Sequence, residues 1–411
     1  MIKRTFPLLS VAIATVVALT LGTGPAGAAV PPLTHPVVVS ADPLDTTPHV
    51  LDGQTEALVD LGSRVIVGGS FTQVKRYSKP DVLARSNLFA YSKAKGEIDT
   101  AFAPQPNGKV TALALAPDGK VFVAGQFKNL GGLATTSYLA KIDPVTGAVD
   151  PTFNASLTGM VYDIGVANGR LYVAGTFTKS RNLVRTNFAV LDVTTGKAVG
   201  ADLPFTAGAV GTTRVMRFDI TPDGTKLVAI GNFTNVGGLT RQNAAMLNLT
   251  PDGGVTVGGW TTDLYRYGLC APSYDTYVYD VDIAPTGGWF VIVTTGAAGG
   301  TSRLCDSAAR WELGVSGPAT TTWRNYTGGD SLTSVAITGT AVYVAGHQRW
   351  SDNPFGADNA GPGALPRQGI AALSPTTGKG LTWNPGRDRR SRRRRGCRTS
   401  AGGRRRRRPG R

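Results

Sequence analysis

Histidine is scarce in this chain of 411 residues, with three copies, and cysteine and methionine are nearly as rare. His35 and His49 precede the repeats described below, and His347 stands alone within the last repeat. None of them has cysteines or acids around it at metal-ligand spacing. A GxSxG elbow, a phosphate-binding loop and a dinucleotide fingerprint are also missing. The sequence therefore predicts no catalytic residue, no cofactor and no metal site.

Long apolar runs are missing too, apart from the one between Phe6 and Leu21. Lys3 and Arg4 precede this run, and the small residues 26–28 follow it, which is the pattern of a cleaved secretory signal over residues 1–28. A retained membrane helix is the alternative, because the run lies at the short limit for a span. No later segment reaches about 18 apolar residues. We therefore expect a secreted or extracellular protein that could associate with the cell surface, with no transmembrane segment after signal removal.

Lysine is absent from residues 387–411, although arginine is abundant there. This segment has fourteen arginines and a net charge of +13, out of +16 for the whole chain, so the part between the signal and the tail is close to neutral. A folded body without a basic surplus predicts no nucleic-acid partner. A tail of arginine, glycine, serine and proline is typical of GC-rich codons in a shifted reading frame. We expect a frameshift; a genuine disordered cationic tail is the alternative.

Of the three cysteines, Cys397 lies in the arginine-rich tail, which leaves Cys270 and Cys305 in the body of the chain. An oxidising compartment would join these two, and we predict a disulfide between them. Two buried free thiols are the alternative.

What the chain does have is a repeat. Glycine is abundant, with 53 residues, and one apolar pattern ending near a glycine recurs at intervals of 50 to 65 residues. Each copy follows a second apolar run and a turn such as Asp118-Gly119 or Asn168-Gly169, and precedes a third run ending in another turn. The six copies are RVIVGGSF at 64–71, KVFVAGQF at 120–127, RLYVAGTF at 170–177, KLVAIGNF at 226–233, WFVIVTTG at 289–296 and AVYVAGHQ at 341–348.

Each unit has room for about four short antiparallel strands, and the central strand is apolar on both faces. Stacked sheets would cover both faces, so the sequence predicts an all-β fold, a β-propeller of six recognisable four-stranded blades over residues 50–386. A β-helix or tandem sandwiches are the alternatives. Residues 29–49 could supply a ring-closing strand through 36–42. We expect seven blades in an intact relative, and an incomplete last blade here.

Two stretches carry a family resemblance: GKVFVAGQFKNLGG at 119–132 and YLAKIDPVTGAVDPTF at 138–153. They resemble the secreted actinobacterial β-propeller proteins of the delta-60 repeat kind, also called domain of unknown function 5122. The resemblance implies an exported propeller with no firmly assigned reaction.

Tyrosines gather around Cys270 in the longest interval between repeats. This loop could contact a sugar or peptide ligand through Tyr265, Tyr267, Tyr274 and Tyr277, and packing of the loop against its own blade is the alternative. We expect a non-catalytic binding or scaffold module for carbohydrate, cell wall or protein, with its partner unknown. The alternative is an exported propeller enzyme, such as a lyase, hydrolase or sugar oxidase, with a site over the central channel.

Overall fold

The computed structural model describes residues 34–386, except residues 78, 209 and 298–299. The predicted signal peptide and arginine-rich tail lie outside these residues. Within them the regular elements are strands, apart from one 3₁₀ turn, η1 at Ala134–Thr136. The all-β prediction is confirmed. No helix in the described part is long and apolar enough to cross a membrane.

The six repeats build six antiparallel sheets, called sheets 1 to 6 in chain order. Within each sheet, every strand pairs with the next strand of that sheet along the chain. Sheet 1 contains β2 (Gln54–Asp60), β3 (Arg64–Ser70) and β6 (Leu88–Ser92), and sheet 2 contains β7 (Val110–Leu115), β8 (Val121–Gly125) and β9 (Leu139–Ile142). Sheet 3 contains β10 (Val161–Ala167), β11 (Arg170–Gly175), β14 (Phe188–Asp192) and β15 (Ala198–Val199), and sheet 4 contains β17 (Arg214–Ile220), β18 (Lys226–Asn232), β21 (Ala244–Leu249) and β22 (Val255–Val257). Sheet 5 contains β24 (Val278–Ile283), β25 (Trp289–Thr294), β26 (Ser307–Glu312) and β28 (Trp323–Tyr326), and sheet 6 contains β29 (Leu332–Ile337), β30 (Val342–Gly346) and β33 (Ile370–Leu373).

The fourth strand expected in every unit forms only in sheets 3, 4 and 5. In sheets 1, 2 and 6 a single bridge stands in its place, at Ile98, Val149 and Gly380 respectively. Sheet 6 is therefore as complete as sheets 1 and 2. The expectation of an incomplete last blade stays a prediction.

Short accessory strands lie outside the six sheets. Most form hairpins between the second and third strands of a unit. They are β1 (His49–Val50) with β4 (Gln73–Lys75) and β5 (Val82–Ala84); β12 (Lys179–Ser180) with β13 (Leu183–Val184); β16 (Phe205–Thr206) with β19 (Asn235–Val236) and β20 (Leu239–Thr240); β23 (Trp260–Thr261) with β27 (Gly317–Pro318); and β31 (Trp350–Ser351) with β32 (Leu365–Pro366).

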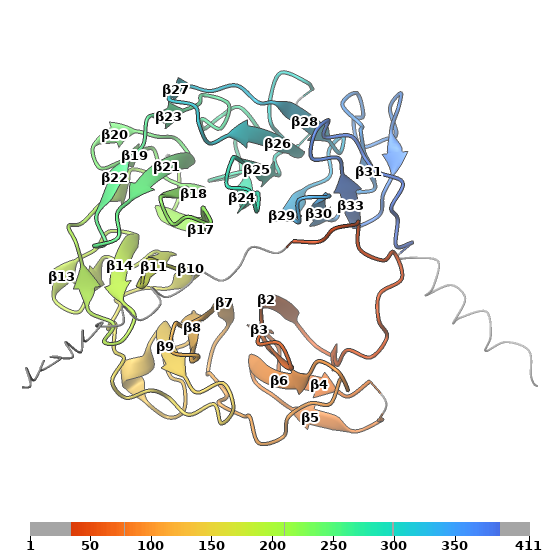
Figure 1. Cartoon of the computed structure of the whole chain (residues 1–411). Coiled ribbons are helices and arrows are strands. Elements are labelled where there is room, and N and C mark those ends of the chain that lie inside the picture. The colour runs from red at the N-terminus through yellow and green to blue at the C-terminus, as the bar shows by residue number, and fades with distance from the viewer. Residues whose placement is uncertain (1–33, 78, 209, 298–299, 387–411) are drawn as a thin grey trace, which may run out of the picture.

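The six sheets follow one another around a common centre (Figure 1). Their first strands, β2, β7, β10, β17, β24 and β29, are neighbours in that order. No pairing joins β29 to β2 among the described residues; the chain segment 34–48 runs between sheets 6 and 1 instead. His35 N–H donates to the Thr338 carbonyl over 3.2 Å, and Val39 N–H donates to the Tyr343 hydroxyl over 2.8 Å. Segment 34–48 contains no strand.

Leu58 of β2 lies on the side of sheet 1 against which no other sheet packs. Its side chain is 63% exposed. The residues at the same position in sheets 3 to 6 are at most 7% exposed, because each packs on the sheet before it: Ile164, Phe218, Val281 and Val335.

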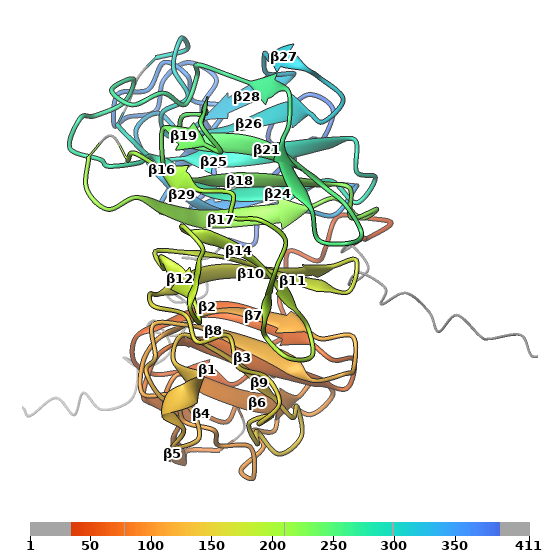
Figure 2. The ribbon, with the colours of Figure 1, turned by 90° about the vertical axis from the view of Figure 1, so that its left-hand side faces the viewer.

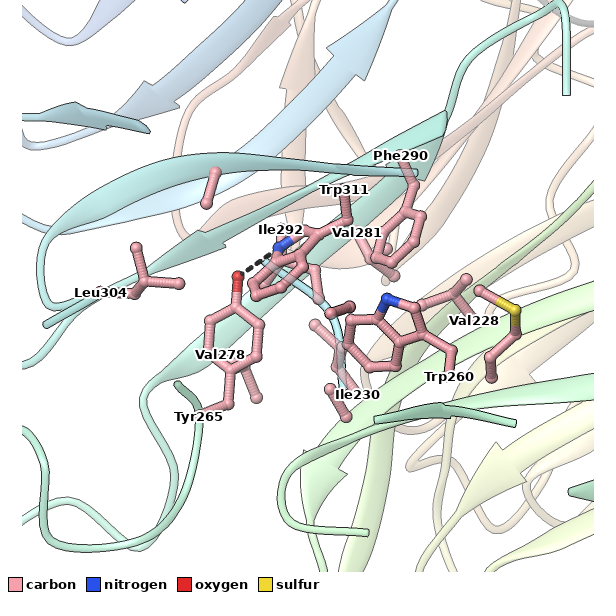
Figure 3. Packing of buried hydrophobic residues seen from close by; sticks show 14 of the residues in the cluster. Val228, Ile230, Trp260, Tyr265, Val278, Val281, Phe290, Ile292, Leu304 and Trp311 are labelled. Atoms are coloured by element: carbon pink, nitrogen blue, oxygen red, sulfur yellow. Dashed lines mark hydrogen bonds between the residues drawn. The ribbon is translucent and has the colours of Figure 1, made fainter. Parts of the chain in front are cut away.

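The hydrophobic cores lie between consecutive sheets, so each sheet is apolar on both faces, as the sequence predicted. Figure 3 shows the core between sheets 4 and 5, where Val228 and Ile230 of β18 meet Phe290 of β25 and Trp311 of β26. Trp260, from the connection between the two sheets, packs edge-on against Trp311 with ring centroids 5.3 Å apart. Burial of such aromatic surfaces is a main source of stability in a repeat array.

The recurring glycine sits beside a β-bulge in the first strand of its sheet. In sheet 3 the register shifts between Val161 and Asp163, opposite Gly175. A Cβ on Gly175 would lie 2.0 Å from the Met160 carbonyl oxygen, so the strand can come this close only without a side chain. Sheet 5 differs from the sequence prediction: Thr294 takes this position, and Gly296 lies two residues beyond it in a left-handed conformation, with φ 123°.

A second motif, Arg-x-Asn or Arg-x-Gly, recurs just before the third strand of a sheet and was not recognised from the sequence. Arg185 donates to the Val184 and Gly200 carbonyls, and Asn187 holds a left-handed φ of 67° while its amide donates to the Phe205 carbonyl. The copies at Arg85, Arg241 and Arg367 make the same pair of carbonyl contacts. These arginines are structural: they satisfy carbonyls that burial would otherwise leave unpaired.

Candidate functional site

The loops that join second to third strands, and one sheet to the next, all emerge at the same end of the sheets because each sheet is an antiparallel meander. In Figure 2 this end lies on the left, where β12, β16 and β19 are labelled. In sheets 5 and 6 these loops depart from the repeat. We call the surface formed by residues 258–277, 295–306, 327–331 and 347–369 the elaborated face; residues 298–299 are not described.

The predicted disulfide between Cys270 and Cys305 is confirmed. It ties segment 258–277 to segment 295–306. Ala271 N–H also donates to the Gly296 carbonyl over 2.9 Å. Two loops of the elaborated face are thereby fixed to each other.

The four tyrosines of this loop fall into two groups. Tyr265 is fully buried, and its hydroxyl accepts the Trp311 indole N–H over 2.9 Å (Figure 3). Tyr277 is 3% exposed and donates to the Leu264 and Arg266 carbonyls. Both rings belong to the protein interior, where they cannot meet a ligand. A ligand-contacting role remains a prediction for Tyr267, which is partly exposed, and Tyr274, which is 37% exposed.

Replacing Tyr265 by phenylalanine should lower the free energy of unfolding by about 1–3 kcal/mol, because the buried Trp311 N–H loses its acceptor. Tyr274→Phe is the matched control and should change it by less than about 0.5 kcal/mol. Chemical denaturation followed by tryptophan fluorescence measures both. Equal stability of the two variants would contradict the role of the hydrogen bond.

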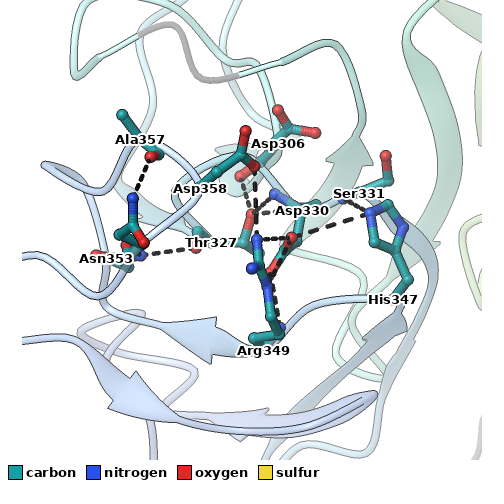
Figure 4. Close-up of polar contacts among 10 residues, drawn as sticks. Asp306, Thr327, Asp330, Ser331, His347, Arg349, Asn353, Ala357 and Asp358 are labelled. Carbon is teal, nitrogen blue, oxygen red and sulfur yellow. Dashed lines mark hydrogen bonds and ion pairs between the residues drawn. The ribbon is translucent and has the colours of Figure 1, made fainter.

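An ion-pair network centred on Asp330 lies on the elaborated face (Figure 4). The Arg349 guanidinium contacts both Asp330 oxygens, with its NH2 2.7 Å from Oδ1 and its Nε 3.0 Å from Oδ2. The Arg349 backbone N–H also donates to Oδ2 over 2.8 Å. Burial alone would raise the pKa of Asp330, but these hydrogen bonds outweigh it and the pKa lies below its usual value. His347 is 67% exposed, with Nε2 4.0 Å from Asp330 Oδ1.

Asn353 anchors the longest loop of this face. It is fully buried, its amide donates to the Thr327 and Asn359 carbonyls, and its Oδ1 accepts the Gly361 N–H. Two residues along, Phe355 projects with 71% of its surface exposed. A small depression beside it is lined by Gly300, Cys305, Tyr326, Gly328, Gly329, Asn353, Pro354 and Gly356.

Asp306 lies under the same loops and differs from Asp330. It is 1% exposed, and neither of its carboxylate oxygens has a hydrogen-bond partner. Burial, with repulsion from Asp330 and Asp358, raises the pKa of Asp306 to about 7.

A second set of carboxylates lies within the first strands of sheets 3 to 5, near the centre of the ring. One Asp163 oxygen accepts its neighbour's N–H, from Ile164, and the other accepts Phe218 N–H of sheet 4. Asp219 bonds in the same way to Ile220 and to Ile283 of sheet 5. Asp280 and Asp282 accept N–H groups of sheet 6, from Val335 and Ile337. We call these four residues the axial aspartates; each links two consecutive sheets.

Burial raises the pKa of Asp163 to about 7 against the attraction of the Arg217 guanidinium. Burial also raises the pKa of Asp280 and, together with repulsion from Asp219, that of Asp282. The axial aspartates were missed because their partners are backbone N–H groups of the next sheet. The only signal in the sequence is an aspartate in the first strand of three consecutive repeats, directly after the bulge in sheets 3 and 5 and two residues later in sheets 4 and 5.

Within the described part of the chain, no group of three or more histidine, cysteine, aspartate or glutamate side chains is arranged to hold a metal ion. The elaborated face instead offers paired charges, an exposed aromatic ring and backbone groups of glycine-rich loops. Such a surface can recognise hydroxyl-rich or peptide ligands through hydrogen bonds and stacking.

One family model agrees with the fold. Residues 116–153 match the family model described as a domain of unknown function (DUF5122) beta-propeller. The matched stretch includes both segments that carry the resemblance in sequence. A β-propeller domain of unknown function is therefore supported. The structure of U3-55K is similar to this chain with a TM-score of 0.45 and 12% identity, over 74% of this chain and 79% of that chain. No curated protein matches.

Proposed function

We propose that the protein is an exported, non-catalytic β-propeller that binds carbohydrate, cell wall or protein through the elaborated face. The disulfide between Cys270 and Cys305 agrees with export, because it forms in an oxidising compartment. The six sheets would be the blades of one propeller domain over residues 50–386. Segment 34–48, hydrogen-bonded to sheet 6, would take the place of a ring-closing strand.

The observation that carries the proposal is an exposed aromatic ring on a rigid loop. Phe355 is 71% exposed, and the buried Asn353 side chain fixes its loop with three hydrogen bonds. In the same segment, 347–369, Arg349 and Asp358 offer donors and acceptors, with the Asp358 side chain 79% exposed. An apolar ring flanked by hydrogen-bonding groups suits the apolar face and hydroxyls of a sugar ring, and preorganisation lowers the entropic cost of binding.

Pull-down on purified peptidoglycan and on insoluble polysaccharides tests the proposal. We expect the wild-type protein to be retained by at least one of them, and Phe355→Ala to bind about tenfold more weakly, which corresponds to about 1.4 kcal/mol. Val145→Ala is the matched control, because Val145 is 62% exposed in the Asp143 turn at the opposite end of sheet 2. It should bind like the wild type.

Retention that is the same in Phe355→Ala and in the wild type would place the binding surface elsewhere. No retention on any of these polymers or on cell-wall proteins would contradict the proposal. Release of soluble fragments from a polysaccharide in the same incubation would favour the alternative, an enzyme with a site over the central channel.

A further inference from the structure

Sheets 1 and 6 are the two ends of the series, and each has one face on which none of the other five sheets packs. On sheet 1 this face contains Leu58 of β2, which is 63% exposed. On sheet 6 it contains Tyr343 of β30, because the adjacent Val342 and Val344 point the other way, into the core shared with sheet 5. Segment 34–48 crosses between the two sheets as a single stretch without a strand and leaves Leu58 exposed (Figure 1).

The interface between sheets 4 and 5 shows what such faces contact elsewhere in the series. By strand register, Val281 stands at the position of Leu58. Val228 stands at the position of Tyr343. The two valines lie in one hydrophobic core, together with Trp260 from the chain that connects the sheets (Figure 3). Leu58 and Tyr343 are therefore the two halves of an interface that is not closed.

Trp383 is the connecting aromatic residue of sheet 6. It follows the bridging Gly380 by three residues, and Phe102 and Phe153 follow the bridging residues of sheets 1 and 2 by four and are buried in the core shared with the next sheet. Trp383 packs on Tyr343 with ring centroids 5.3 Å apart, and its buried indole N–H has no hydrogen-bond partner in the described part of the chain. Sheet 6 thus carries the aromatic residues of an interface without the sheet that would complete it.

The occupant of the opening between sheets 6 and 1 must be apolar on two faces, because one sheet stands on either side of it. A second copy of the chain has no such sheet to offer, since each of its six sheets is already covered on at least one face by a neighbour. Residues 387–411 do not fit, because burying their net charge of +13 between apolar faces would cost more than packing returns. A β-hairpin that is free and apolar on both faces meets the requirement.

We propose that the opening between sheets 6 and 1 is a docking site for one further β-hairpin of this repeat, supplied by a separate polypeptide chain. Its strands would be the counterparts of β17 and β18. Side chains at the positions of Val228 and Ile230 would cover Leu58, as they cover the first strand of sheet 5. A side chain at the position of Phe218 would cover Trp383 on the other side, as Phe218 packs in the core between sheets 3 and 4. Burial of these apolar surfaces would drive the association, whatever ligand the elaborated face binds.

Fluorescence anisotropy of a fluorescein-labelled peptide of residues 214–232, which spans β17 and β18, tests the site on the full-length protein. A second form of the peptide is closed by a disulfide between cysteines added at its ends, because Arg214 and Asn232 face each other in the hairpin. We expect saturable binding, and Leu58→Asp should weaken it about tenfold or more, because docking would bury the new charge. Leu239→Asp is the matched control, since Leu239 is 50% exposed in β20, and it should bind like the wild type.

Absence of saturable binding of either peptide up to about 0.5 mM would overturn the proposal. Equal binding by Leu58→Asp and the wild type would overturn it as well. A concentration-dependent dimer in sedimentation velocity that Leu58→Asp abolishes, without peptide binding, would assign the surface to a second copy and contradict the proposal. Phe355→Ala should leave peptide binding unchanged; a loss of binding in this variant would place the peptide on the elaborated face instead.

Discussion

Replacing Gly175 by alanine is expected to destabilise the protein strongly. The new Cβ would lie 2.0 Å from the Met160 carbonyl oxygen, and that atom belongs to the backbone beside the bulge of β10. Side chains can rotate away from an added methyl group, but a bulged backbone held on both sides cannot. We expect a loss of more than about 3 kcal/mol, at the upper end of overpacking effects.

Urea denaturation followed by circular dichroism measures this loss. Gly314→Ala is the matched control, because a Cβ there meets no atom within 4 Å, and it should leave stability within about 0.5 kcal/mol of the wild type. Gly69, Gly125, Gly231 and Gly346 face the same contact, with a carbonyl oxygen 2.1 to 2.3 Å from the added Cβ. A Gly175→Ala protein as stable as the wild type would refute the steric explanation of the repeated glycine.

Sheet 5 shows the limit of that explanation. Thr294 occupies the glycine position there, and its hydroxyl accepts the Ser307 N–H over 3.0 Å. The position therefore accepts a side chain where the adjoining strand supplies a partner for it. The sequence pattern placed Gly296 at this position because it aligned the glycines of the repeats and took no account of which residues face each other on paired strands. Register is set by pairing with β24, which a linear pattern does not contain.

Local chemistry was the predictable part of the fold. Asn168-Gly169 was expected to turn a hairpin, and both residues have positive φ, 52° and 66°. The disulfide was predicted from the oxidising compartment expected for an exported protein and from the presence of two cysteines in the body of the chain. The fourth strands were not predictable: Val149 forms one bridge whereas Val255–Val257 form a strand, although both are short apolar runs after a turn.

The candidate site was less predictable than the fold. Tyr265 and Tyr274 have the same chemistry and lie in the same loop, yet one is fully buried and the other 37% exposed. Burial depends on Trp311, which comes from a strand more than forty residues further along the chain. Asp306 likewise meets Asp330 and Asp358 only because three loops of two sheets converge. No spacing in the sequence encodes that convergence.

Raising the pH from 5 to 8 is expected to destabilise the protein, because the axial aspartates bind protons more tightly when folded. The pKa of Asp163 rises from its ordinary value of 3.8 to about 7 on folding. Below pH 4 the Asp163 carboxyl is protonated in both the folded and the unfolded state, so this group does not make the free energy of unfolding depend on pH. Between pH 4 and 7 the unfolded chain releases the proton and the folded chain holds it, so stability falls as pH rises. At about 1.4 kcal/mol per pKa unit, this single group accounts for roughly 4 kcal/mol.

Carboxyl groups whose pKa is lowered on folding have the opposite effect on stability, and they act in a lower pH range. Burial opposes ionisation of Asp150, but hydrogen bonds from Lys120 and Thr152 outweigh it and lower its pKa to about 2. Its contribution is present above pH 4 and is lost as the pH falls through 4 toward 2. The two trends together place maximum stability near pH 4–5, below the usual optimum of globular proteins.

The variant Asp163→Asn isolates the axial contribution. Asparagine keeps an oxygen to accept the Phe218 N–H of the next sheet but carries no charge to desolvate. We expect this variant to be more stable than the wild type at pH 8, because the charge penalty is removed. At pH 5 it should be equal to the wild type or weaker, because an amide NH2 replaces the second oxygen, which accepts the Ile164 N–H. Exposed Asp263, replaced by asparagine, is the control and should follow the wild-type profile. Urea midpoints measured at half-unit steps from pH 4 to 8 decide the matter: a wild-type stability that rises across this range would show that the axial carboxylates are ionised at low cost, and that links between sheets depend on their charge.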